Sequence, residues 1–130
     1  MFSHLNQLTL PLEYLQVLGW KPVSITFKVF FVMIFVNLQL KINNGLESDF
    51  IKELNILLKE TRSYEGCHSV YFIQNQDDPS NLEFCSKWDT KQHYEKYLKW
   101  RIDSGVMGEV ANKYLDGKPI WRYFDLVSEF

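Results

Sequence analysis

The chain has 130 residues, of which 46% are hydrophobic and 16% aromatic, a composition that supplies one sizeable core and excludes an intrinsically disordered chain. Its formal net charge is −2, and its lysines and arginines are scattered along the sequence. Because nucleic-acid binding needs clustered positive charge, we expect no nucleic-acid partner.

An N-terminal extension is predicted over residues 1–32, followed by a domain that spans residues 33–130. Pro11 suits the first turn of a short helix over Leu12–Leu18, and Gly19 would end that helix. The extension then continues into the start of a strand.

The most hydrophobic run covers residues 25–36 and is predicted to be a strand. A membrane-spanning helix needs about 18 or more apolar residues. This run is shorter, is interrupted by Lys28 and leads into Asn37 and Gln39. It also lacks the basic lead and the small-residue cleavage site of a secretory signal. We therefore expect a cytoplasmic protein without a membrane partner.

The predicted strand extends from Val23 to Ile42, either as one long strand or as two strands with a bend, and its second half alternates between two faces. One face carries the apolar residues Ile34, Val36, Leu38, Leu40 and Ile42, and the other carries Asn37, Gln39 and Lys41. The turn signal Asn43-Asn44-Gly45 ends the strand. A helix with apolar residues at helical spacing is predicted from Glu47 to Arg62.

A β-hairpin is predicted after Gly66. Its first strand covers Cys67–Asn75, and its return strand covers Leu82–Asp89. The acidic turn between them contains Pro79, which presets the backbone angle φ. If the turn closes around residues 77–80, Cys85 pairs roughly with Phe72 and lies too far from Cys67 for a disulfide.

Two helices and a last strand complete the predicted domain. Thr90 is a good N-cap for a helix over Lys91–Asp103, and Ser104-Gly105 breaks that helix. A further short helix is predicted over Val106–Leu115. The last strand is predicted over Ile120–Val127.

The main elements follow the order strand, helix, strand, strand, helix, strand. This is the ferredoxin-like βαββαβ pattern of α+β proteins, with a four-stranded antiparallel sheet and the helices on one face. The second and last strands carry apolar residues on both faces, so the uncovered face would expose a large apolar patch. A second copy of the sheet is the simplest cover and predicts a twofold homodimer. Contacts with the N-terminal extension are the alternative.

The two cysteines, Cys67 and Cys85, are predicted to be free thiols in a reducing compartment. No CxxC motif and no zinc-type spacing of cysteine and histidine is present. We therefore expect no metal site.

The run Glu65–Leu98, EGCHSVYFIQNQDDPSNLEFCSKWDTKQHYEKYL, resembles the antibiotic biosynthesis monooxygenase (ABM) family. The shared features are a Glu-Gly pair, a strand, an Asp-Asp-Pro turn, a strand that ends in tryptophan, and a helix with aromatic residues. The resemblance extends from about Met33 to Val127. The resemblance implies a dimeric α+β barrel. The family includes cofactor-independent oxygenases of polyketide and quinol substrates as well as haem-degrading enzymes.

Two residues of the polyketide-oxidising branch are matched here. They are the strand tryptophan, Trp88, and a tyrosine six residues later, Tyr94. The branch also has an asparagine four residues before the tryptophan, and Phe84 stands in that position. The haem-degrading branch would need a tryptophan and a histidine where this chain has Tyr97 and Met107. Without that histidine no axial ligand for haem iron is evident, so the resemblance implies a protein without a cofactor.

A cofactor-free oxygenase needs an apolar cavity with a few placed hydrogen-bonding groups. The candidate catalytic residues are Trp88, Tyr94 and His68, the last as a general base. The candidate substrate-binding residues are Asn37, Tyr97 and Trp100. The alternative is that the aromatic residues are ordinary core or interface residues and that His68 is structural.

The sequence leaves two hypotheses for function. The first is a cofactor-independent monooxygenase that acts on a small aromatic or quinol-like substrate. The second is a non-catalytic module on the same fold that binds a small molecule or an interaction partner.

Overall fold

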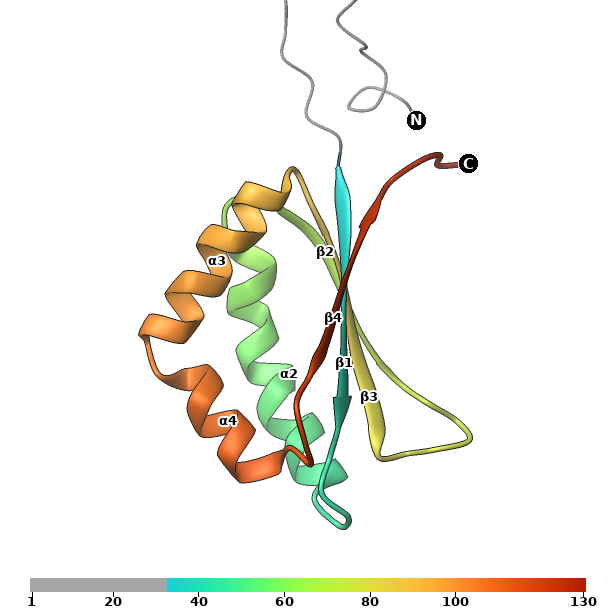
Figure 1. Cartoon of the computed structure of the whole chain (residues 1–130), viewed down its shortest axis with the longest axis vertical. Coiled ribbons are helices and arrows are strands. Elements are labelled where there is room, and N and C mark those ends of the chain that lie inside the picture. The colour runs from blue at the N-terminus through green and yellow to red at the C-terminus, as the bar shows by residue number, and fades with distance from the viewer. Residues whose placement is uncertain (1–32) are drawn as a thin grey trace, which may run out of the picture.

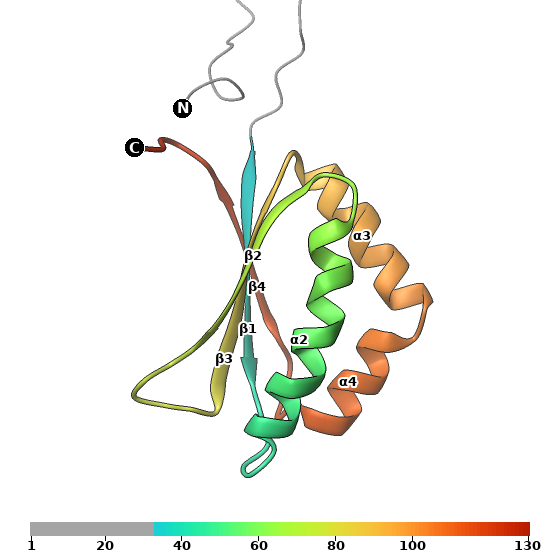
Figure 2. The same ribbon diagram turned by 180° about the vertical axis from the view of Figure 1, so that it is seen from behind.

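The computed structural model describes residues 33–130, which form a four-stranded sheet with three helices against one face (Figure 1). The elements are β1 (Ile34–Lys41), α2 (Glu47–Ser63), β2 (Cys67–Gln74), β3 (Asn81–Trp88), α3 (Lys91–Asp103), α4 (Val106–Tyr114) and β4 (Ile120–Asp125). Seen from behind, the sheet again lies edge-on, with α2, α3 and α4 all on the same side of it (Figure 2). The helix over Leu12–Leu18 and the strand start from Val23 lie outside the described residues.

The strands lie in the order β2-β3-β1-β4, and every neighbouring pair is antiparallel. This is the arrangement expected for a ferredoxin-like α+β fold. The central strand β1 pairs with both β3 and β4, so Val36 lies opposite Ser86 on one side and Tyr123 on the other. Residues of three strands are thereby brought onto one face, beneath the helices.

The alternation predicted for β1 is confirmed. Ile34, Val36, Leu38 and Leu40 face the helices and are buried in two core clusters. One cluster gathers around Phe50 of α2, which is fully buried. The other gathers around Trp88 at the end of β3, which is also fully buried. The two clusters occupy the two ends of the layer between the sheet and the helices.

The N-cap of α3 is confirmed at Thr90. Its side-chain oxygen accepts a hydrogen bond of 3.1 Å from the backbone N–H of His93 and lies 2.7 Å from the Nδ1 atom of the same residue. Because the cap fixes where the helix begins, α3 starts at Lys91 as predicted. The break at Ser104-Gly105 then separates α3 from α4.

Gly66 connects α2 to β2 in a conformation that favours glycine. Its φ angle is +89°, and a Cβ atom built on it would lie 2.6 Å from the ring of His93. The glycine therefore allows the start of α3 to pack directly on the backbone that leads into the hairpin.

The hairpin register differs by one residue from the prediction. Cys85 lies opposite Tyr71 rather than Phe72. The backbone N–H of Asn75 bonds to the carbonyl of Asn81 at 3.0 Å, so the loop comprises residues 76–80. The Asn75 side chain accepts bonds from the N–H groups of residues 77 and 78, and this Asx turn lengthens the loop by one residue.

Both cysteines are free thiols, as predicted. Cys67 is buried, and burial raises the pKa of its thiol to about 11. A β-bulge lies between Cys67 and Ser69. It displaces His68 from the regular alternation of the strand, so this side chain is exposed.

The face of the sheet turned away from the helices is covered by no element of residues 33–130 (Figure 1). We call it the open face. It exposes the large apolar side chains of Tyr71, Ile73, Ile120 and Phe124. Asn37 lies at its centre and is buried. Its side chain donates to Glu83 at 3.0 Å and accepts from Arg122 at 3.0 Å, so its polar atoms are paired. The open face is thus an apolar surface around a satisfied polar centre.

None of the helices within residues 33–130 is long and apolar enough to cross a membrane.

Candidate functional site

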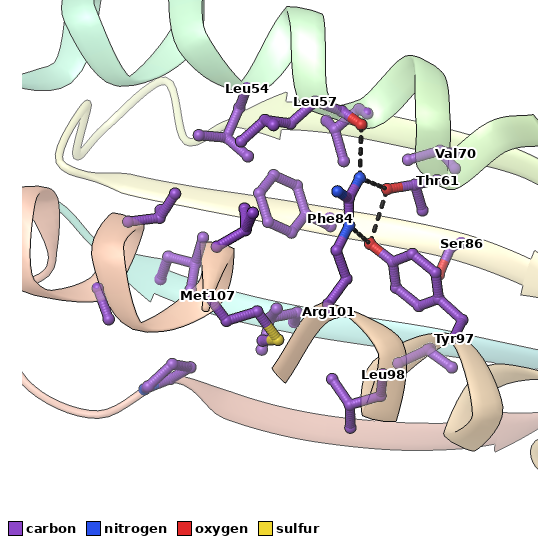
Figure 3. A pocket seen from close by; sticks show the side chains of 18 of the residues that line it. Leu54, Leu57, Thr61, Val70, Phe84, Ser86, Tyr97, Leu98, Arg101 and Met107 are labelled. Carbon is purple, nitrogen blue, oxygen red and sulfur yellow. Dashed lines mark hydrogen bonds between the residues drawn. The ribbon is translucent and has the colours of Figure 1, made fainter. Parts of the chain in front are cut away.

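A cavity of about 320 Å³ lies between the sheet and the three helices (Figure 3). This volume falls at the lower end of the roughly 300–1,000 Å³ that is usual for small-molecule sites. Its lining residues come from all seven helices and strands that the structure describes and from the loop between α4 and β4. They are Val36, Leu38, Leu40, Phe50, Leu54, Leu57, Leu58, Thr61, Val70, Phe84, Ser86, Tyr94, Tyr97, Leu98, Arg101, Val106, Met107, Gly108, Val110, Ala111, Leu115, Pro119 and Trp121.

The polar groups of the cavity are few and lie mainly at one place. Arg101 is the single charged residue among the lining residues that the structure describes, and no carboxylate, imidazole or thiol accompanies it there. The hydroxyl groups come from Thr61, Ser86, Tyr94 and Tyr97. The cavity is therefore an apolar space whose polar groups, one guanidinium and four hydroxyls, can all donate hydrogen bonds.

Arg101 crosses from α3 to α2 at the centre of the view in Figure 3. Its Nη2 atom donates to the Leu57 carbonyl at 2.7 Å and to the Thr61 hydroxyl at 3.3 Å. Its Nε atom donates to the Tyr97 hydroxyl at 3.1 Å. The Thr61 and Tyr97 oxygens lie 2.7 Å apart and share a hydrogen bond. The guanidinium group is therefore held in one orientation by partners on both helices.

Tyr94 also lines the cavity and contacts Trp121 of β4. Its hydroxyl accepts a hydrogen bond of 2.8 Å from the Nε1–H of Trp121. Burial raises the pKa of this hydroxyl well above its usual value. Tyr94 therefore keeps its proton near neutral pH and remains a hydrogen-bond donor.

Trp88 lies behind the cavity wall and does not line it. It is fully buried, and its Nε1–H donates to the Ser86 hydroxyl at 2.8 Å. Its ring packs against Tyr94 at 5.3 Å and Tyr97 at 5.1 Å between ring centroids. Trp88 thus fixes three residues that do line the cavity.

Some hydroxyl protons of the cavity have no acceptor within residues 33–130 and can bond to a ligand. Ser86 and Tyr94 each accept a bond from an indole N–H, and neither proton has an acceptor among residues 33–130. Thr61 and Tyr97 hold two protons but share one hydrogen bond, so one proton remains. Up to three hydroxyl protons are thus available to an acceptor oxygen within the cavity.

The remaining predicted site residues lie elsewhere. His68 is exposed and pairs with Asp89, its Nε2 atom 2.5 Å from the carboxylate. Asn37 lies on the open face, across the sheet from the cavity. Trp100 is partly exposed and stacks on Tyr64 at the outer side of α3. The structure therefore brings together Tyr94 and Tyr97, with Trp88 behind them, and leaves the other three outside the cavity.

Three polar residues of the cavity were not predicted from the sequence, namely Thr61, Ser86 and Arg101. The available signal was the apolar stripe of α3, in which Arg101 follows Tyr94 by seven residues and Tyr97 by four. An arginine at that spacing among aromatic residues indicates a side chain that faces inward. Ser86 and Thr61 carry no comparable signal.

Residues 33–130 contain no group of three or more histidine, cysteine or acidic side chains close enough to hold a metal ion.

Comparisons with known proteins agree on one family. The family model described as antibiotic biosynthesis monooxygenase matches residues 33–100. No curated protein matches the chain.

Solved structures share the fold at low sequence identity. A conserved protein from Methanosarcina mazei Go1 aligns over 72% of this chain and 92% of its own, with a TM-score of 0.65 and 16% identity. A protein from Caulobacter crescentus CB15, provisionally named an antibiotic biosynthesis monooxygenase, aligns over 76% and 93%, with a TM-score of 0.62 and 18% identity. One from Nitrosomonas europaea, named in the same way, aligns over 76% and 94%, with a TM-score of 0.61 and 11% identity. At these identities the likeness shows a common fold.

Proposed function

The chain belongs to the antibiotic biosynthesis monooxygenase family, whose model matches more than half of it, and on this premise we propose that it is a cofactor-independent monooxygenase of a small aromatic or quinol-like substrate. The observation that carries the proposal is the apolar cavity between sheet and helices. Its walls suit a flat hydrophobic ring system, and its hydroxyl protons suit the oxygen atoms of such a substrate. The names of the similar structures point to the same reaction class.

The reaction needs no electrons from outside the substrate. An activated CH₂ group loses a proton to water, and the resulting carbanion passes electrons to O₂. A carbon–oxygen bond forms, and the peroxide takes a proton back from water to give a hydroperoxide. The hydroperoxide then loses water, so that CH₂ and O₂ become C=O and H₂O. The protein's part is to exclude water from the ionised substrate and to orient it towards O₂. Tyr94 and Ser86 would hold its oxygen atoms, and Trp88 would position both residues.

Oxygen uptake with a panel of quinols and anthrones tests the proposal. Tyr94→Phe removes one donor from the cavity, so we expect kcat/KM to fall about tenfold to a hundredfold. Tyr71→Phe makes the same chemical change on the open face and should leave the rate unchanged. Equal rates for the two variants would show that the Tyr94 hydroxyl takes no part in the reaction. Absence of uptake with every compound would reject the oxygenase.

A non-catalytic binding module remains the second candidate, and one observation favours it. The cavity-lining residues of the described chain include no general base, and Phe84 stands where the polyketide-oxidising branch has an amide. Saturable binding of quinols without oxygen uptake would support this function. Turnover by the wild-type protein would exclude it.

We also propose that the open face packs against a second copy of the chain. Its exposed side chains, Tyr71, Ile73, Ile120 and Phe124, form an apolar surface of the kind that oligomers bury. The buried polar centre at Asn37 is already satisfied within one copy, so burial of this face would leave no unpaired group there.

A further inference from the structure

We propose that Arg101 makes the cavity selective for ligands that carry an ionised oxygen, as a phenolate or an enolate does. The proposal rests on the proposed function of the same cavity and narrows its substrate class. It follows from the hydrogen bonds that Arg101 makes, from the charge around it and from the rigidity of its position.

The donors of Arg101 are only partly used. A guanidinium group has five N–H donors. The Nε–H bonds to Tyr97, and the two Nη2–H groups bond to the Leu57 carbonyl and to Thr61. The Nη1 atom carries no dashed line in Figure 3, and among residues 33–130 no hydrogen bond accounts for its two donors. Two charge-assisted donors are therefore available to a ligand.

The positive charge is also poorly neutralised. The Arg101 side chain is buried, with only 6% of its surface exposed. The carboxylate of Glu60 lies 3.9 Å from Nη1, which is too long for a hydrogen bond, and its side chain is 57% exposed. Because a buried charge is unfavourable without a hydrogen-bonded counter-ion, an anionic ligand oxygen would gain from this position.

The position is fixed before any ligand arrives. Three hydrogen bonds to two helices hold the guanidinium plane, and Trp100 packs over it at 4.5 Å. Little side-chain entropy therefore remains to be lost on binding. The Thr61–Tyr97 pair adds a hydroxyl proton beside the guanidinium, so an oxygen bound there would meet only donors. This environment favours an ionised oxygen over a protonated one.

A matched pair of probes, naphthol and its methyl ether, tests the inference. The two have similar apolar rings, but only naphthol ionises. Binding of both is measured by titration across the pH range in which naphthol ionises, and the naphtholate absorbance band reports the ionisation of the bound probe. In the wild-type protein we expect naphtholate to bind roughly ten- to a hundredfold more tightly than the ether, and bound naphthol to ionise at a lower pH than free naphthol.

Three variants test whether Arg101 causes the tighter binding of naphtholate than of the methyl ether. Arg101→Gln should abolish the preference and still bind the ether, which shows that the cavity has formed. Arg101→Lys should retain part of the preference. Glu60→Gln removes the competing carboxylate at an exposed position and should increase the preference.

Several outcomes would overturn the inference. Equal binding of naphtholate and ether by the wild-type protein would do so, as would failure of both probes to bind. A preference that survives in Arg101→Gln, or one that falls in Glu60→Gln, would also do so. Selective binding without any oxygen uptake would support the inference while rejecting the monooxygenase.

Discussion

At the scale of single residues, two tryptophans position hydroxyl groups that line the cavity, Trp88 from behind the wall and Trp121 from within it. Trp88 holds the Ser86 oxygen through its indole N–H and packs against two tyrosines. Trp121, on another strand, orients the Tyr94 hydroxyl. Because each indole supplies a proton to a hydroxyl oxygen, that hydroxyl is left to act as a donor. Two tryptophans therefore decide the hydrogen-bonding character of the site.

A substitution at Gly66 measures how much stability depends on the close packing of α3 against the chain before β2. Gly66→Ala places a Cβ atom 2.6 Å from the His93 ring in addition to the strain of a positive φ, so we expect a loss of about 2–4 kcal/mol in the free energy of unfolding. Gly45→Ala has the same positive φ with nothing within 4 Å and should lose only about 1–2 kcal/mol. Urea denaturation measures both. Equal losses of unfolding free energy in the two variants would show that the His93 ring moves aside without an energetic cost.

The site residues could be predicted only in part from the sequence. Tyr94 and Tyr97 were identified because their spacing places them on one face of a helix. His68 and Asn37 were proposed for the same site, yet the bulge exposes the first and the strand alternation carries the second to the open face. Arg101 was not identified because its role depends on acceptors of α2, which lie forty or more residues earlier in the chain.

At the scale of elements, local signals in the sequence set most boundaries. Thr90 marks the beginning of α3, and Ser104-Gly105 marks its end. The return strand of the hairpin was predicted over Leu82–Asp89 and is found over Asn81–Trp88. That shift follows from the Asx turn at Asn75, whose side-chain hydrogen bonds a pattern of apolar residues does not reveal.

At the same scale, we expect the N-cap at Thr90 to contribute to the stability of the fold. Thr90→Ala removes the acceptor for the His93 N–H, so the free energy of unfolding should fall by about 1 kcal/mol. Thr90→Ser retains the oxygen and should lose much less. Thermal denaturation followed by circular dichroism compares the two. Equal losses for serine and alanine would show that the methyl group of threonine, and not the cap, carries the effect.

At the scale of the whole molecule, the fold could be predicted but the cavity could not. The order of strands and helices restricts the topology to the ferredoxin-like arrangement, and β4 then lies beside β1. The cavity depends instead on how far α3 and α4 stand from the sheet. That separation is set by side chains from seven elements packing together, and no local pattern encodes it.

The open face makes a prediction about assembly. The wild-type chain should sediment at twice its mass of 15.5 kDa, because the apolar face would be buried between two copies. The double variant Ile73→Lys/Ile120→Lys should sediment as a monomer, since two desolvated charges would oppose the contact. Ile56→Lys alters an exposed isoleucine of α2 and is the control. A wild-type monomer at micromolar concentration would contradict the dimer and favour cover by the N-terminal extension.

The pairing of β1 with β4 also has a consequence for folding. It joins Ile34 to Asp125, nearly the two ends of the described chain, and contacts between such distant residues form slowly. During synthesis the hairpin and α2 emerge well before β4 does. Because Trp121 of β4 orients Tyr94, the cavity is complete only after the last strand has docked. We expect probe binding to recover in the slowest phase of refolding, and recovery in an earlier phase would show that the cavity forms without β4.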